Sequence, residues 1–196
     1  VHSISDLSSY TTAGFSSTYV NDDYDYYDVY IHDAKATGNA ASNYNYLYCR
    51  FKHGSTTITT SNTYVSRGYL SGMKITPSLD TWEAGNWASL SSLIFLNSSN
   101  STGDTAIGSG SQSTWNGHYR FYNFRNTTTY KGMRQLDGQY FSHDLNYGTP
   151  VYYQAFGHYD DGTSAAYTTK IDGMKFGIGY GSPFTAGSMR LYGWKK

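Results

Sequence analysis

Tyrosines at alternate positions are the side chains of this sequence with the clearest chemistry. Two sets occur, Tyr44, Tyr46 and Tyr48 in one and Tyr26 and Tyr30 in the other. Successive side chains of a β-strand point to opposite faces, so each set forms a stripe on one face. A tyrosine ring offers apolar area with a hydroxyl at its rim, which suits sugar rings and protein interfaces alike. The stripes therefore predict glycan binding or, as the alternative, packing against a second sheet or a neighbouring subunit.

Catalytic chemistry has little support in the pattern. The six histidines are scattered, no serine-nucleophile or zinc-protease motif is present, and Glu83 is the one glutamate. A glycosidase needs two carboxylates held a few ångströms apart, and nothing in the spacing selects such a pair of aspartates. We therefore expect a protein that is not an enzyme and has no cofactor, with a glycan-cleaving enzyme as the less favoured alternative.

A group of aspartates raises the question of a metal. Asp22, Asp23, Asp25 and Asp28 lie close together in the sequence, and calcium is bound by about six to eight oxygens, often from such carboxylates. The spacing lacks the glycine and the final glutamate of a calcium-binding loop. A calcium site and a solvated loop are both open interpretations of this segment.

The elements that would position these residues are strands. Short alternating runs separated by turn residues predict strands at 24–33, 43–53, 63–70, 92–97 (a central strand), 118–125, 151–159, 170–178 and 188–194, with weaker ones at 128–133 and 139–142. An Asp137-Gly138 turn separates the weaker two, and only 79–95 has room for a short helix. We predict an all-β fold, a jelly-roll-like antiparallel β-sandwich, as one domain over residues 1–196, alone or within a longer protein.

The apolar faces of these strands define the expected core. The single cysteine, Cys49, excludes an intramolecular disulfide, and its place between Leu47 and Phe51 predicts a buried hydrophobe rather than a nucleophile. The residues expected to be buried are Leu47, Cys49, Phe51, Phe95, Met174, Phe176, Ile178 and Leu191.

The composition agrees with this fold and argues against two classes of function. Aromatic residues reach 18%, with 22 tyrosines, so that tyrosine can supply the core that the few aliphatic residues cannot. The formal net charge is zero, whereas nucleic-acid and membrane-surface binders need a basic surplus. No apolar run approaches the roughly 20 residues of a membrane helix. We expect no nucleic-acid partner and no membrane insertion.

The two ends of the chain carry strand motifs. The opening has a Tyr-Asp-x-Tyr strand at 24–31 and a second strand at 46–51. The close has a glycine-containing strand at 171–178 and the motif Gly-small-x-Arg-Leu-Tyr-Gly at 187–193. In these motifs the chain resembles tail-fibre and other virion structural proteins of bacteriophages, especially marine and cyanobacterial phages. The matching ends predict that the first and last strands pair at the centre of the sandwich.

The resemblance implies a non-enzymatic virion component, a tail-fibre, spike or capsid-fibre domain that contributes to host-surface attachment. Its partners would be other virion proteins and a host-surface glycan. It would be assembled in the host cytoplasm and carried on the extracellular particle. A neutral, tyrosine-rich surface predicts a homo-oligomer, trimeric or otherwise. The alternative is a carbohydrate-binding, lectin-like module outside a virus.

Overall fold

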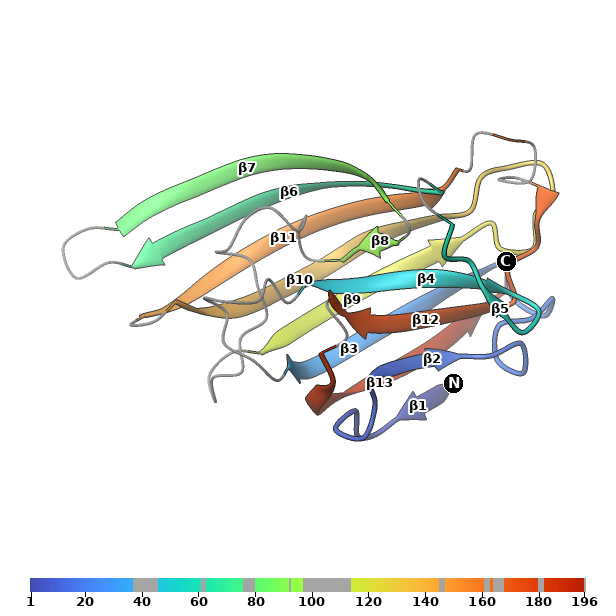
Figure 1. The fold of residues 1–196 in the computed structure, drawn as a ribbon, viewed down its shortest axis with the longest axis horizontal. Coiled ribbons are helices and arrows are strands. Elements are labelled where there is room, and N and C mark those ends of the chain that lie inside the picture. Colours follow the sequence, from blue (N-terminus) through green and yellow to red (C-terminus); the bar gives the residue numbers. More distant parts are fainter. Residues whose placement is uncertain are drawn as a thin grey trace.

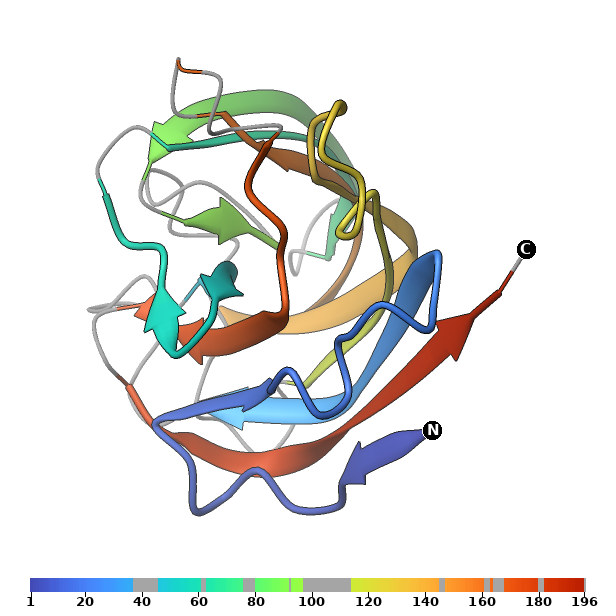
Figure 2. The same ribbon diagram turned by 90° about the vertical axis from the view of Figure 1, so that its right-hand side faces the viewer.

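Two antiparallel β-sheets pack face to face, and the larger sheet curves around the smaller (Figures 1 and 2). The structure is a computed structural model, and the residues that it describes are 1–36, 46–60, 63–75, 80–91, 93–96, 114–144, 147–160, 163, 168–179 and 182–195. All thirteen elements assigned in these residues are strands. The predicted all-β sandwich is confirmed.

The larger sheet has eight strands and the smaller sheet has five. In spatial order the larger sheet contains β1 (His2–Ile4), β13 (Phe184–Trp194), β3 (Tyr26–Ala36), β9 (Trp115–Tyr122), β10 (Gly132–Asp144), β11 (Tyr147–Tyr159), β6 (Tyr64–Ile75) and β7 (Asp80–Ser91). The smaller sheet contains β2 (Thr12–Phe15), β12 (Gly173–Ile178), β4 (Leu47–His53) and β5 (Thr56–Thr57), with β8 (Ile94–Phe95) also paired to β4.

The strand order follows the winding of a jelly roll. β1 pairs with β13 in the larger sheet, and β2 pairs with β12 in the smaller one. The opposite edges of the same late strands pair with β3 and β4. The predicted pairing of the chain ends is therefore confirmed for β3 and β13, although β1 itself lies at the edge of its sheet rather than at the centre.

Aromatic rings fill the space between the sheets. The Phe51 ring lies 4.9 Å from Phe124 and 6.2 Å from Phe121, measured between centroids. The buried Tyr64 hydroxyl accepts a hydrogen bond from the Phe51 amide (2.9 Å) and donates one to the Ile58 carbonyl (3.2 Å). Tyrosine can enter this core because such bonds satisfy its hydroxyl.

The predicted core is confirmed wherever its side chains are described. The buried members are Leu47, Cys49, Phe51, Met174, Phe176, Ile178 and Leu191. The side chain of Phe95 lies outside the described part of the structure.

Two local predictions are wrong, and the one segment with room for a short helix forms strands instead. The segment at 92–97 was expected to form a central strand, but its strand β8 is two residues long and pairs only with β4 among the described strands. The segment at 79–95 forms β7 and β8 in its described residues, not a helix. Asp137-Gly138 lies inside the single long strand β10, because a register shift between Gln135 and Asp137 absorbs the extra residue as a bulge.

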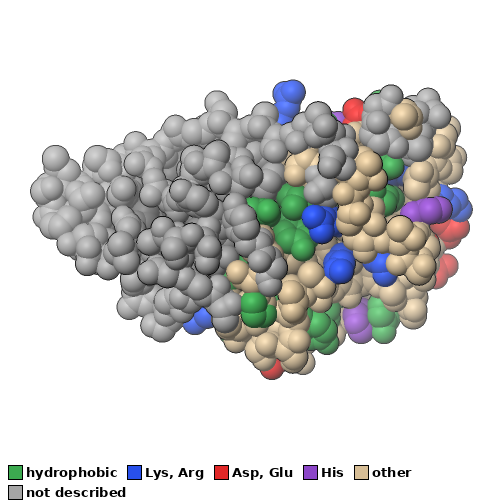
Figure 3. Space-filling model, viewed as in Figure 1, with side chains coloured by type: hydrophobic (Ala, Val, Ile, Leu, Met, Phe, Trp, Pro, Cys, Tyr) green, Lys and Arg blue, Asp and Glu red, His purple; other side chains and the backbone are tan. Residues whose placement is uncertain are grey.

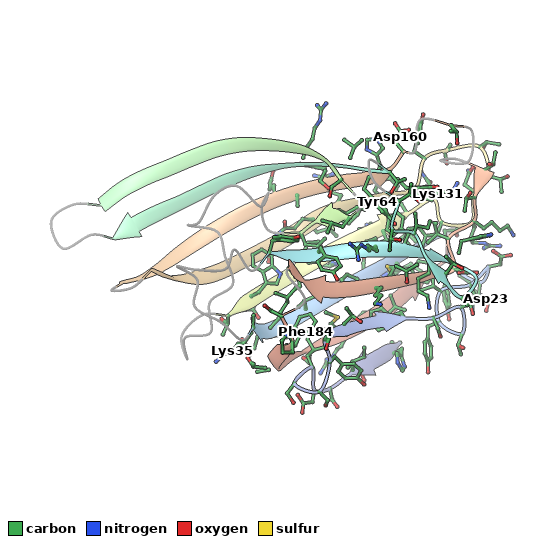
Figure 4. The ribbon with its side chains drawn as sticks, in the orientation of Figure 1. Asp23, Lys35, Tyr64, Lys131, Asp160 and Phe184 are labelled. Carbon is green, nitrogen blue, oxygen red and sulfur yellow. The ribbon has the colours of Figure 1, made fainter. Side chains whose placement is uncertain are left out.

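Backbone hydrogen bonds tie β11 to the loops beside it. The Tyr159 amide donates to the Lys131 carbonyl (2.9 Å), and the Asp160 amide donates to the Thr63 carbonyl (2.8 Å). Figure 4 shows Tyr64, Lys131 and Asp160 close together at this end of the molecule. Lys131 is fully buried, and burial lowers the pKa of its ammonium group.

Candidate functional site

The outer face of the larger sheet gathers aromatic side chains from three neighbouring strands. Alternate residues of β3 (Tyr27, Val29 and Ile31) are buried in the core, so the residues between them face outward. Register places Trp194, Tyr26 and Tyr122 in one row across β13, β3 and β9. A second row holds Tyr192, Asp28 and Arg120, and a third holds Arg190, Tyr30 and His118. We call these nine residues the aromatic face.

A buried carboxylate lies at the centre of the aromatic face. Asp28 is 1% exposed, and Arg120 donates from Nε and Nη2 to its two oxygens, each at 2.8 Å. This hydrogen-bonded pairing raises the pKa of the Arg120 guanidinium. The guanidinium carbon also lies 4.4 Å from the centroid of the Tyr26 ring, in a cation–π arrangement. The charge of Asp28 is thus neutralised inside the sheet surface.

Ring contacts fix the tyrosines around this pair. Tyr30 stacks on His118 with centroids 4.0 Å apart and the planes inclined by 16°. Its ring meets the edge of Tyr192 at 5.4 Å. The His118 Nε2 atom lies 3.6 Å from an Asp28 oxygen, beyond hydrogen-bond distance. These contacts hold the rings in place before any ligand arrives, which lowers the entropy cost of binding.

An open depression of about 1100 Å³, the first depression, lies on one side of the aromatic face. Its aromatic lining comes from Tyr30, Tyr192 and Trp194. The register of β13 against β3 shifts here, and Gly187 adopts a φ of +116°. A Cβ on Gly187 would lie 2.7 Å from the Ala34 Cα, so only glycine permits this close approach of the strands.

Polar groups accompany these rings in the first depression. Its lining includes His32, Asp33, Arg190 and Asp6. The Asp6 carboxylate accepts hydrogen bonds from the amide (2.8 Å) and the hydroxyl (2.9 Å) of Ser8, which lower its pKa and keep it an anionic acceptor. Donors and acceptors around an aromatic wall are the arrangement that a hydroxyl-rich ring requires.

A second open depression, of about 840 Å³, adjoins the first. Tyr26 lines it and stacks on Trp194 of the first depression, with centroids 6.2 Å apart, so this ring pair forms the divide. Tyr122, Arg120 and Arg134 line the second depression on the other side.

The described members of the predicted stripe Tyr44, Tyr46 and Tyr48 lie on the outer face of the smaller sheet and are buried or half-buried. Tyr48 is 8% exposed, packs with Leu93 and half-buried Tyr46, and lies over Gly177 of the adjacent strand. Figure 3 shows this side of the molecule, where hydrophobic side chains lie beside Lys and Arg side chains. Tyr48 thus points away from the core, as the alternation predicts, and its ring packs over a neighbouring strand. Tyr44 lies outside the described residues.

Two of the four clustered aspartates, Asp22 and Asp28, pair with basic side chains. Asp22 accepts a hydrogen bond from Lys170 Nζ (2.9 Å), which lowers the pKa of the carboxyl, and lies 3.6 Å from Arg125. Asp28 is paired with Arg120. Within the described part of the chain, no three His, Cys, Asp or Glu side chains come together as metal ligands. The buried Cys49 has a pKa raised by desolvation, as suits a core thiol.

Comparison with known proteins finds no matching family model, no matching curated protein and no matching solved structure. The resemblance to bacteriophage virion proteins therefore stays a prediction from the sequence motifs.

Of the described residues, none belongs to a helix of the length and apolar character needed to cross a membrane.

The sequence pattern predicted site residues on β3 but none on its neighbours β9 and β13. Tyr26 and Tyr30 were selected, whereas Arg120, Tyr192 and Trp194 were not. A signal for the last two was present, because Tyr192 and Trp194 alternate with buried Met189 and Leu191 along β13. Nothing in the sequence indicates that Arg120 pairs with Asp28, since the two are 92 residues apart.

Proposed function

We propose that this protein is a non-catalytic attachment domain that binds carbohydrate through the aromatic face. The observation that carries the proposal is the first depression, where Tyr30, Tyr192 and Trp194 stand beside His32, Asp33 and Arg190. Ring faces contact the apolar side of a sugar, and the charged groups bind its hydroxyls. Of the tyrosines predicted to bind, Tyr26 and Tyr30 belong to the aromatic face.

Two carboxylates of the site, Asp6 and Asp28, favour binding without hydrolysis. A glycosidase needs a carboxylic acid whose pKa is raised so that it can protonate the leaving group. The pKa of Asp6 is lowered by its bonds from Ser8, and the buried Asp28 is neutralised by Arg120. Both carboxylates fit an accepting or structural role better than that of a general acid.

The proposal is tested by affinity electrophoresis of the purified protein in gels that contain soluble polysaccharides. Trp194→Ala and Tyr192→Ala should each weaken binding by about five- to thirtyfold, because a stacking ring contributes on the order of 1–2 kcal/mol. Tyr130→Ala is the matched control, since Tyr130 is 47% exposed and does not line either depression.

Two results would overturn the proposal. One is a protein that no polysaccharide in a broad panel retards. The other is retardation that all three variants share with the unmodified chain. Release of reducing ends from a retarding polysaccharide would contradict the non-catalytic part.

We propose further that this attachment takes place at the surface of a virion. The support is the motif resemblance at 24–31 and 187–193, and a jelly-roll sandwich is an architecture that viral capsid domains use. Peptides of this chain should co-purify with particles through a density gradient and be detected there by mass spectrometry. If these peptides are consistently absent from particles of the source that encodes the chain, the virion proposal is contradicted. The lectin-like alternative then remains.

A further inference from the structure

Two arginines lie directly opposite each other on the outer face of the larger sheet. Arg134 of β10 is the register partner of Arg120 of β9. Like charges at directly opposite positions repel and destabilise a strand pair. An arrangement of this kind needs an anion nearby, and the two arginines share the lining of the second depression.

The neighbouring carboxylate of the protein, Asp28, is already paired with one of the two arginines. Both Asp28 oxygens accept from Arg120, on the side away from Arg134. Arg134 is exposed, and within the described residues no carboxylate forms an ion pair with it. The guanidinium of Arg134 is therefore available to a ligand from solution.

The surroundings add positive charge and a ring surface. Lys170 and Arg125 also line the second depression, together with the carboxylates Asp22 and Asp25. Asp22 pairs with both Lys170 and Arg125, and the four Arg and Lys side chains of the lining outnumber its two carboxylates. Tyr122, which is 38% exposed, also lines the second depression and is the register partner of Tyr26. Arg134 lies near enough to its hydroxyl to act against the rise in the Tyr122 pKa that burial causes.

We infer that the second depression binds the anionic group of an acidic polysaccharide, a carboxylate or a sulfate ester, between Arg120 and Arg134. The inference rests on the proposed function, because the Tyr26–Trp194 ring pair lets one sugar chain run from the first depression into the second. Arginine forms paired hydrogen bonds with carboxylates and with tetrahedral oxyanions, and Tyr122 offers its ring to the sugar that carries the charge. A polysaccharide is favoured over a nucleic acid because the formal net charge of the chain is zero.

The test compares acidic polysaccharides with their neutralised forms. A sulfated galactan is paired with its desulfated product, and polygalacturonate with its carboxyl-reduced product. Affinity is measured by calorimetry at low and at moderate salt. We expect the acidic member of at least one pair to bind about tenfold tighter, with an advantage that shrinks as salt rises. The pair that shows the difference identifies sulfate or carboxylate as the ligand group.

The decisive variant is Arg134→Gln, which leaves the Asp28–Arg120 pair intact. It should remove the preference for the acidic form and leave affinity for the neutral form unchanged. The matched control is Arg67→Gln, since Arg67 is an exposed arginine of β6 that does not line the second depression. Arg67→Gln should keep the preference.

The outcomes separate this inference from the function on which it rests. Equal affinity for acidic and neutral forms, or equal losses in Arg134→Gln and Arg67→Gln, would overturn the anion site while carbohydrate binding stands. A loss of both forms in Trp194→Ala with no effect in Arg134→Gln would do the same. Binding of single-stranded DNA but of no polysaccharide, abolished by Arg134→Gln, would overturn both proposals.

Discussion

At the scale of single residues, Asp28 is the charge on which the aromatic face depends. Its side chain is 2% exposed, whereas that of Arg120 is 38% exposed. The arginine can therefore return to water if the pair is broken, and the aspartate cannot. The two partners should not be equivalent on substitution, because an uncompensated buried charge is far more costly than an exposed one.

Arg120→Met should destabilise the protein by about 3 kcal/mol, since it leaves the Asp28 carboxylate buried without its cation. Asp28→Asn keeps the shape and an acceptor oxygen and should cost about 1 kcal/mol. Urea unfolding followed by tryptophan fluorescence measures both free energies of unfolding. A smaller loss in Arg120→Met than in Asp28→Asn would show that Asp28 does not need the arginine.

His158 should make stability depend on pH. Burial of the half-buried ring lowers its pKa, with a further contribution from the charge of Arg67, although Asp160 acts in the opposite direction. In the unfolded chain the pKa of a histidine is about 6.5. As the pH falls below that value, the unfolded chain binds the proton first, and the free energy of unfolding decreases.

The fall in the urea midpoint between about pH 7.5 and 5.0 should therefore be smaller in His158→Gln than in the unmodified protein. His32→Gln serves as the control, because His32 is an exposed residue of β3. An unchanged pH dependence in His158→Gln would show that burial does not disfavour the charged form of His158.

At the scale of elements, tyrosine rings lie over glycines of the neighbouring strand. Tyr48 of β4 covers Gly177 of β12, where an added Cβ would meet its hydroxyl oxygen at 2.5 Å. Tyr122 of β9 covers Gly132 of β10 in the same way. A glycine without a side chain weakens a strand, and a ring from the adjacent strand shields its backbone and restores packing.

Tyr48→Ser should accordingly destabilise the protein by about 2 kcal/mol, because it exposes Gly177 and removes a ring that is 8% exposed. Tyr10→Ser is the comparison, since Tyr10 is 40% exposed, and it should change stability by less than about 0.5 kcal/mol. Thermal unfolding gives both values. A loss in Tyr48→Ser no larger than that in Tyr10→Ser would mean that the ring does not support the strand.

The strand faces could be predicted because alternation is a local property. Val29 and Ile31 alternate with Tyr30 within a few residues, so the sequence alone indicates which side is buried. The site could not be predicted in full, because it depends on which strands become neighbours. Tyr26 meets Trp194 and Arg120 only once β13 and β9 flank β3. The Asp137-Gly138 bulge was missed for the same reason, since the partner strand decides whether such a pair turns the chain.

At the scale of the whole molecule, the larger sheet extends well beyond the roll. The jelly-roll pairing accounts for β1, β13, β3 and β9, and the strands β10, β11, β6 and β7 continue the same sheet. β7 pairs with β6, and its other edge has no strand partner among the described residues. Free edges of this length favour association of subunits.

The chain should therefore sediment above its monomer mass of 21.9 kDa at micromolar concentration. A trimer or another closed assembly agrees with the expectation of a homo-oligomer. Sedimentation velocity over a hundredfold range of concentration measures the state directly. A single species at the monomer mass across that range would contradict the expectation.

The pairing of the earliest strands with the latest ones constrains the folding of the chain during its synthesis. β3 and β4 need β13 and β12 at one edge, and these strands begin only at Phe184 and Gly173. While the ribosome is still translating the middle of the chain, β12 and β13 do not yet exist. The apolar side chains of β3 and β4 then lack the packing that these partner strands complete. Pairings across such sequence separations form slowly and leave nascent chains prone to aggregate. Chaperones that hold the growing polypeptide would thus matter most just before the final two strands leave the exit tunnel.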